Sequence, residues 1–206
     1  YASFTQSKMF EKGVKCNDCH DVHSVKTIKD NNDLCLKCHR PDLYNSPNHH
    51  FHKMESEAGN DHLVNRGKPD YKTGTGAQCV NCHMVGKFYM GNDYRRDHSF
   101  RIPRPDLTIS IGTPNACNDC HTDKTAIWSQ GFVEKWYGSK KRPHYGETFA
   151  AALKNDTKAV NELILYAGNE LFPLMVRATA VHFLGNYNDI LSRKAIEKAL
   201  NDPSSL

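Results

Sequence analysis

The sequence predicts a mainly α-helical protein, in which a loop-rich module (residues 1–127) is followed by a short helical-repeat segment (residues 128–206). Three observations lead to this prediction. The first part is dense in Gly, Pro, Asn, Asp and His, and few of its apolar residues recur with a regular period. All eight cysteines lie in this part. Beyond it, cysteine is absent and apolar residues recur at the spacing of amphipathic helices.

The composition is polar for a chain of this length. The 206 residues have room for one or two domains, yet only 38% are hydrophobic and the mean hydropathy is −0.67. The net charge of +4, with histidine neutral, is too small to indicate nucleic-acid binding. No stretch approaches the roughly 20 apolar residues of a transmembrane helix, so no membrane span is expected. The sequence has no secretory leader at Tyr1, and we expect a mature exported product or a fragment.

The eight cysteines form four C-x-x-C-H motifs, numbered here 1 to 4 in chain order. In such a motif the two thiols add to the vinyl groups of one haem, and the following histidine binds the iron from the proximal side. Two intervening residues let one turn of backbone present both sulfurs to the same porphyrin edge. The sequence therefore predicts four covalently attached haem c groups. Their residues are Cys16, Cys19 and His20; Cys35, Cys38 and His39; Cys79, Cys82 and His83; and Cys117, Cys120 and His121.

Three other uses of paired cysteines compete with this interpretation. A disulfide framework does not require histidine after every second cysteine. A thioredoxin-like site needs one C-x-x-C near a βαβ pattern, not four in a strand-poor chain. Zinc is the strongest competitor, because motifs 1 and 2 form a C-x2-C-x15-C-x2-C pattern. Motifs 3 and 4 are separated by 34 residues, outside the usual zinc spacing, and zinc would not need histidine in four motifs out of four.

Several histidines outside the motifs are candidates for the second ligand of each iron. His23 follows His20 by three residues, on nearly the same side of a helical turn, so we expect it to ligate a neighbouring haem rather than its own. The HHFH cluster (His49, His50 and His52) lies just upstream of motif 3. His98 lies in an arginine-rich stretch, and these arginines could pair with haem propionates: Arg95, Arg96, Arg101 and Arg104.

The remaining histidines and the methionines are weaker candidates. His62 is left open between ligand and surface residue, whereas His144 and His182 lie far from any motif and are expected at the surface or as helix caps. Because histidine is in surplus, Met9, Met84 and Met90 are expected in ordinary packing roles. Ligation by two histidines leaves no open iron site and keeps reduction potentials below those of His/Met cytochromes.

Three amphipathic helices are predicted near the end of the sequence. Val160, Leu163, Ile164 and Ala167 follow the i, i+3, i+4, i+7 pattern. A second helix starts near Pro173 and can end at Gly185, and a third starts after the plausible N-cap Asp189. One such HEAT-like or TPR-like unit cannot bury its apolar faces by itself. We therefore expect an incomplete repeat region that packs on the cysteine-bearing module or on a neighbouring protein.

Several segments resemble a family of bacterial exported multihaem cytochromes, in which a haem module precedes TPR-like or HEAT-like repeats. The resemblance is close over residues 8–128 and looser over the helical remainder, through FPLMVRATAVHFLGNY. It implies haem at the four motifs, and it matches His23, the HHFH cluster and His98 to recurrent non-motif histidines. The chain stops earlier than the longer family members. The segments are KGVKCNDCHDVHS, LCLKCHRPDLY, HHFH, AQCVNCHM, YRRDHSFRIPRPDL and GTPNACNDCHTDKTAIW.

These features predict electron transfer through four mostly bis-His haems, without bond chemistry on a substrate. Haem c is attached outside the bacterial cytoplasmic membrane, so a periplasmic or extracellular location is expected. The expected partners are redox proteins or other copies of the chain, and not nucleic acid. Two alternatives remain: a subunit of an extracellular cytochrome filament, and a small-molecule redox enzyme with one open haem. All four motifs end in histidine, so the C-x-x-C-K variant of one nitrite reductase class is absent.

Overall fold

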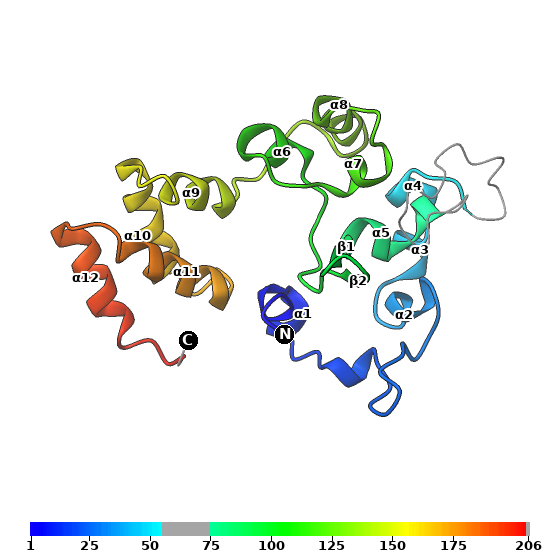
Figure 1. The fold of residues 1–206 in the computed structure, drawn as a ribbon, viewed down its shortest axis with the longest axis horizontal. Coiled ribbons are helices and arrows are strands. Elements are labelled where there is room, and N and C mark those ends of the chain that lie inside the picture. The colour runs from blue at the N-terminus through cyan, green and yellow to red at the C-terminus, as the bar shows by residue number, and fades with distance from the viewer. Residues whose placement is uncertain (55–74, 205–206) are drawn as a thin grey trace.

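The computed structural model describes residues 1–54 and 75–204. Within these ranges the chain is mainly helical, which confirms the predicted class. Figure 1 shows the elements arranged in an arc, with α2 to α5 at one end, α6 to α8 in the middle and α9 to α12 at the other end. The N-terminal helix α1 lies between the two ends of this arc. No helix in the described ranges has the length and apolar content that crossing a lipid bilayer requires.

The first half of the chain is built from single helical turns joined by loops. Short turns are expected here, because Pro, Asn and Asp occur every few residues and stop longer helices. In one of them, α4, Ser46 caps the first turn by accepting a hydrogen bond from the Asn48 backbone. The turns are η1 (Phe4–Gln6), α1 (Lys8–Glu11), η2 (Cys16–Asp18), α2 (Asp33–Leu36), α3 (Pro41–Tyr44), α4 (Pro47–His50), η4 (Thr75–Ala77) and α5 (Cys79–His83).

A two-stranded antiparallel hairpin follows α5 and was not anticipated from the sequence. Strand β1 (Gly86–Tyr89) pairs with β2 (Asp93–Arg96), with Gly86 opposite Arg96. The Phe88 and Tyr94 rings face each other across the pair at 5.2 Å. Two aromatic runs around a Gly-Asn turn are a local hairpin signal, and this signal was present in KFYMGNDYRR. The hairpin carries the chain from motif 3 to the segment that contains His98.

Three helices form the middle of the arc. Helix α6 (Pro105–Ile111) starts with proline in its first turn and ends at Gly112, whose φ of 74° is accessible to glycine at little cost. Helix α7 (Ala116–Cys120) carries motif 4. Helix α8 (Ala126–Tyr137) is capped by Thr125, which accepts a hydrogen bond from the Trp128 backbone. Helix α8 packs against α6 and α7, as Figure 1 shows, rather than against the later helices.

The three amphipathic helices predicted from the sequence are confirmed. They are α10 (Val160–Gly168), α11 (Leu174–Leu184) and α12 (Ile190–Ala199), preceded by α9 (Tyr145–Ala152) and the short turn η5 (Thr157–Ala159). Asp189 caps α12 as predicted, because its carboxylate accepts from the backbone of Leu191 and Ser192. Gly185 is the C-cap of α11. The arrangement of these helices as a repeat array stays a prediction.

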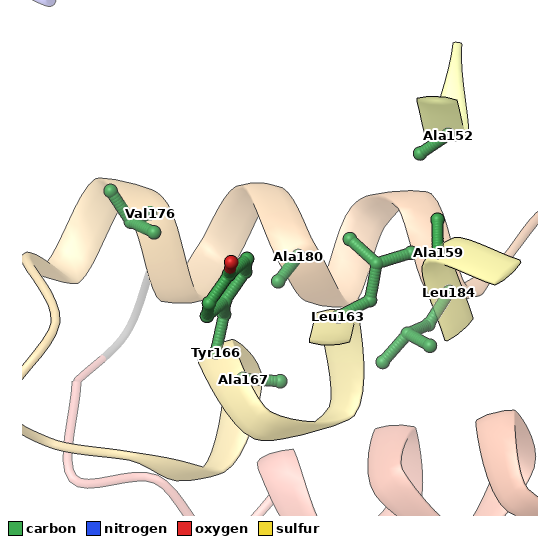
Figure 2. Close-up of a cluster of buried hydrophobic side chains, with 8 residues drawn as sticks. All are labelled: Ala152, Ala159, Leu163, Tyr166, Ala167, Val176, Ala180 and Leu184. Atoms are coloured by element: carbon green, nitrogen blue, oxygen red, sulfur yellow. The ribbon is translucent and has the colours of Figure 1, made fainter. Parts of the chain in front are cut away.

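The largest hydrophobic cluster of the described residues lies between α10 and α11 (Figure 2). Leu163 points from α10 toward Ala180 and Leu184 of α11, and all three are fully buried. Tyr166 and Val176 extend the same interface. Burying one Leu side chain contributes roughly 1.5–3 kcal/mol, so this cluster holds the helical segment together.

The helical segment also packs on the cysteine-bearing module, as the sequence analysis expected. Helix α9 lies against α6, and α11 lies against η1 at the N-terminus. The Arg101 guanidinium donates to the Tyr145 hydroxyl at 2.7 Å and to the Gln6 side-chain oxygen at 2.6 Å. One arginine therefore links three segments that are far apart in the sequence.

Candidate haem-binding site

Each C-x-x-C-H motif lies at a single helical turn. The histidine backbone N–H donates to the carbonyl of the first cysteine in motif 1 (2.9 Å), motif 2 (3.0 Å) and motif 4 (2.8 Å). Motif 3 is itself the one-turn helix α5. This turn brings both thiols and the imidazole to one place, as thioether attachment and proximal ligation require. All eight cysteines are among the described residues, and none of them forms a disulfide.

The four motifs lie next to one another in chain order. Burial raises the pKa of Cys19 in motif 1, Lys37 lowers it, and the Cys35 and Cys38 thiols of motif 2 raise it further. A hydrogen bond between Cys35 and Cys79, which joins motifs 2 and 3, raises the pKa of Cys35 and lowers the pKa of Cys79.

The same proximity extends to motif 4. Burial raises the pKa of Cys82 to about 11, and the charges of Cys117 and Cys120 act in the same direction. The helices α5 and α7 that carry these two motifs are in contact. Motif 1 therefore neighbours motif 2, motif 2 neighbours motif 3, and motif 3 neighbours motif 4.

Polar bridges hold successive motifs together. The Lys37 ammonium group of motif 2 donates to the Asp18 carbonyl of motif 1 at 3.0 Å. Asn32, just before motif 2, accepts from the Cys79 backbone at 2.9 Å and donates to the Ala77 carbonyl at 3.1 Å. These bonds join segments that are not adjacent in the sequence, so the spacing of the motifs is set by the fold.

Three motif histidines each face a histidine from outside the motifs. The ring centres of His20 and His98 are 6.2 Å apart, with the ring planes at 34°. His83 and His49 are also 6.2 Å apart and nearly parallel, at 11°. His121 and His52 are 6.3 Å apart, at 34°. These three imidazole pairs bring together residues that the sequence analysis had singled out separately.

The separation of each imidazole pair fits one iron between the rings. A histidine nitrogen binds a transition metal at roughly 2 Å, and the ring centre lies about 1 Å behind that nitrogen. Two rings that ligate the same iron from opposite sides therefore have centres about 6 Å apart. Rings stacked directly on each other would lie much closer, so the spacing matches axial ligation.

Backbone carbonyls orient four of these imidazoles. The Nδ1 atoms of His20, His83 and His98 lie 2.8, 2.9 and 3.0 Å from the carbonyls of Val25, Arg101 and Arg96. The Nδ1 atom of His52 binds the His50 carbonyl in the same way. Because a carbonyl can only accept, Nδ1 carries the proton and Nε2 is left to bind a metal.

The environment also favours neutral imidazole, which is the ligating form. Burial and the neighbouring His83 lower the pKa of His49. Burial and the neighbouring His52 lower the pKa of His121. His49 of the HHFH cluster and His121 of motif 4 thus lie in surroundings that favour the ligating form.

The other predicted ligands have different positions. His50 does not face a motif histidine in the described structure, and instead its Nδ1 accepts from the His52 backbone at 3.2 Å. The helical turn expected over His20 and His23 is wrong, because the Asp21 carboxylate captures the His23 and Ser24 backbone N–H groups. No ring within the described residues lies against His23, and its ligation stays a prediction. His62 lies outside the described residues.

Motif 2 differs from the other three motifs. The ring next to His39 is Tyr44, at 5.6 Å and nearly perpendicular. The Tyr44 ring also lies 5.1 Å from the ring of His49, which faces His83. The phenol ring therefore lies next to both His39 and His49. Among the described residues, no second imidazole faces His39.

Several residues expected near the haems are held by protein groups. Arg104 pairs with Asp106 at 2.7 Å, and Arg95 pairs with Asp93 at 2.6 Å. Arg96 donates to the carbonyls of Val80 and Met84 at the end of α5.

As expected, His144 acts as a helix cap, and it accepts from the Gly146 backbone at the start of α9.

Three residues that hold the imidazole pairs were missed by the sequence analysis: Phe51, Gly76 and Trp136. Phe51 stacks on Trp136 with ring centres 4.5 Å apart. The signal for Trp136 was present, since Trp128, Phe132 and Trp136 recur at i, i+4 and i+8 on one face of α8. Nothing in the local sequence marks Gly76, whose role depends on a side chain from another segment.

The zinc alternative gains no support from the structure. In residues 1–54 and 75–204, no group of three or more His, Cys, Asp or Glu side chains converges to hold a metal ion. A structural zinc site needs four such ligands around one point. At motifs 1, 3 and 4 the imidazoles instead group in twos, and each motif brings its two thiols and one imidazole to a single turn, as haem c attachment requires.

Residues 25–100 match the family described as cytochrome c554 and c-prime. This match includes motifs 2 and 3, the HHFH cluster and His98. It supports a c-type cytochrome that transfers electrons, with haem c and its iron as cofactor. No curated protein and no solved structure is detectably similar to the chain.

Proposed function

We propose that this chain transfers electrons along four covalently bound haem c groups, three of which have two histidine ligands. The observation that carries the proposal is the set of three imidazole pairs, each of which joins one motif histidine to one non-motif histidine. The ligand sets are His20 with His98, His83 with His49, and His121 with His52. Haem supplies a one-electron couple at its iron, and the chain supplies spacing, axial ligands and surroundings.

The protein residues have three tasks in this function. The thiols and proximal imidazoles attach the groups in the order of motifs 1 to 4. The distal imidazoles close the second axial position, which favours reversible electron transfer over binding of small ligands. The carbonyls that hold Nδ1 raise the basicity of the ligating nitrogen, which stabilises the oxidised state and keeps the potential low.

The exposure of the motifs suggests where electrons enter or leave. Cys16 and Cys38 are exposed, whereas the cysteines of motifs 3 and 4 are partly buried. A partner protein, or another copy of the chain, can therefore approach most closely at motifs 1 and 2. We also propose that the protein is exported to the periplasm or beyond, because bacterial haem c is attached outside the cytoplasmic membrane, and that it is not an enzyme.

Absorbance and electron paramagnetic resonance of the oxidised protein test this proposal, together with a potentiometric titration. We expect at least three low-spin haems and a series of one-electron couples at low potential. Protein that carries four haems but shows high-spin signals at most of them would contradict the ligand pairs. Protein that carries no covalent haem would refute the whole proposal.

A second candidate function depends on motif 2. The described residues provide Tyr44 but no second imidazole beside His39, which favours an open iron position and binding of a small molecule there. The competing assignment is ligation of this iron by His23. Stoichiometric cyanide or nitrite binding to the native protein supports the open site. If the native protein binds no cyanide and His23→Ala loses one low-spin haem, His23 is the second ligand of the motif 2 iron.

A further inference from the structure

The HHFH cluster serves two haems from one turn of chain. His49 faces His83 of motif 3, and His52 faces His121 of motif 4. In a continuous helix these residues would lie at i and i+3 on one face, and both would point toward the same partner. The backbone at Phe51 prevents this, because it is left-handed, with φ of 54° and ψ of 25°. The two imidazoles therefore diverge toward different motifs.

The left-handed conformation of Phe51 needs support from elsewhere. For an aromatic residue this region is unfavourable, and it persists only where surrounding contacts hold it. The Phe51 ring stacks on Trp136 of α8, with centres 4.5 Å apart and planes at 1°. It also meets Tyr137 edge to face, at 5.6 Å and 85°. The C-terminal end of α8 thus clamps this ring.

The same two residues of α8 contact both ligands directly. The Tyr137 hydroxyl donates to the His49 carbonyl. The Trp136 ring lies 6.3 Å from the His52 ring, at 68°. A Cβ atom at Gly76 would lie 2.4 Å from the His52 ring carbon Cδ2. His52 therefore lies beside the aromatic end of α8 and also against a position where no side chain fits.

We propose that Phe51 and Trp136 form one anchor that positions the distal ligands of two different haems. This proposal rests on the ligand pairs of the proposed function. It adds that helix α8 sets the positions of both His49 and His52, and thereby the distal ligation of the haems at motifs 3 and 4. Phe51 and Trp136 are positioning residues and do not themselves touch the iron. Loss of the anchor should alter both haems together and leave the His20–His98 haem unchanged.

The test compares variants of the full chain by the number of low-spin haems and by the reduction potentials. His49→Ala and His52→Ala provide the reference spectra, each expected to lose one low-spin signal. Trp136→Leu should reproduce both losses together, or shift both potentials, whereas Trp136→Phe keeps a stacking ring and should restore the native spectrum. Phe172→Leu removes an aromatic ring that packs on Tyr166 in the helical segment, away from the motifs, and serves as the control that should leave the haem spectra and potentials unchanged.

Gly76→Ala gives an independent check of the geometry. The three atoms nearest to the added methyl group all belong to His52, so Gly76→Ala should reproduce the His52→Ala spectrum and alter that one haem. Intact mass and far-ultraviolet circular dichroism establish that each variant is folded and carries all its haems. The signal of the His20–His98 haem serves as an internal reference.

The outcomes separate the anchor from the function on which it rests. If His49→Ala and His52→Ala each remove one low-spin haem but Trp136→Leu leaves spectra and potentials native, the anchor is refuted and the ligand pairs stand. If neither histidine variant changes the spectrum, the ligand assignment itself is wrong, and the anchor falls with it. Joint loss in Trp136→Leu with a native Trp136→Phe supports the anchor.

Discussion

The imidazole rings of His20 and His98 lie 6.2 Å apart, although two other motifs lie between them in the sequence. Each ring is fixed by a carbonyl at Nδ1, from Val25 and from Arg96. Because a carbonyl engages Nδ1 of each ring, Nε2 of both rings is left to bind a metal, as the proposed ligand pair requires. The segment that carries His98 follows the β hairpin, so this small sheet helps to place His98 beside His20.

His98→Ala should convert one haem from low spin to high spin without loss of covalent attachment. The physical reason is that the His20–His98 pair closes the axial positions of the motif 1 iron, whereas the thioethers do not depend on His98. Electron paramagnetic resonance and intact mass measure the two properties. His182→Ala is the control, since this residue lies in α11, and an unchanged spectrum in His98→Ala would exclude the pair.

Four covalent haems should be present in the mature protein. Intact mass in denaturant should exceed the 23.4 kDa polypeptide by four haem groups. Replacing both Cys117 and Cys120 by Ala should lower this gain by one group, because thioethers at both positions hold one haem. A mass equal to the bare polypeptide, from correctly matured native protein, contradicts the interpretation of all four motifs.

Leu163→Ala should lower the free energy of unfolding of the helical segment by about 2–5 kcal/mol, because a fully buried Leu leaves a cavity. Thermal or denaturant unfolding, followed by far-ultraviolet circular dichroism, measures the loss. Leu165→Ala is a matched control on the same helix, since Leu165 is 51% exposed and its replacement should cost much less. The haem spectrum should be native in both variants, and equal losses in the two would contradict the packing in Figure 2.

Acid should weaken the start of α6. The hydrogen bond and charge of Arg104 lower the pKa of the Asp106 carboxyl in the folded protein. A lowered pKa means that the stabilisation is present above the unfolded pKa of about 3.9 and is lost as the pH falls through the folded pKa. Asp106→Asn should remove this part of the pH dependence below about pH 4, with an effect below roughly 1 kcal/mol. If the free energy of unfolding depends on pH in the same way in Asp106→Asn and in the native protein, the Arg104–Asp106 ion pair does not contribute to acid sensitivity.

Val25→Asn should raise the free energy of unfolding by roughly 1 kcal/mol, because Val25 has φ of 60°, where a β-branched residue is disfavoured and Asn is tolerated. The carbonyl that holds His20 is kept in this variant, so the spectrum should be native. Val22→Asn is the control, because Val22 is similarly exposed and is not among the residues with positive φ. If both variants gain the same free energy of unfolding, the cause is the replacement of an exposed apolar side chain by a polar one and not relief of backbone strain.

Local patterns in the sequence were sufficient to predict the covalent chemistry and the last three helices. The C-x-x-C-H spacing is a property of one helical turn, so each motif identifies its thiols and proximal histidine without reference to the rest of the chain. The apolar periodicity over residues 160–167 and the Asp189 cap likewise depend only on near neighbours. The hairpin was missed although its Gly-Asn turn was visible between two aromatic runs, because each strand is only four residues long and carries charged residues.

The pairing of ligands was decided only by the tertiary structure. The sequence singled out His49, His50, His52 and His98 as candidates, but which iron each one faces depends on contacts between distant segments. The left-handed turn at Phe51 sends His52 away from His49, and this turn is held by Trp136, which lies far along the chain. By itself, therefore, the sequence predicts where haem attaches, since that chemistry is local. The fold decided which imidazoles face one another, because that depends on packing between segments that no local pattern relates.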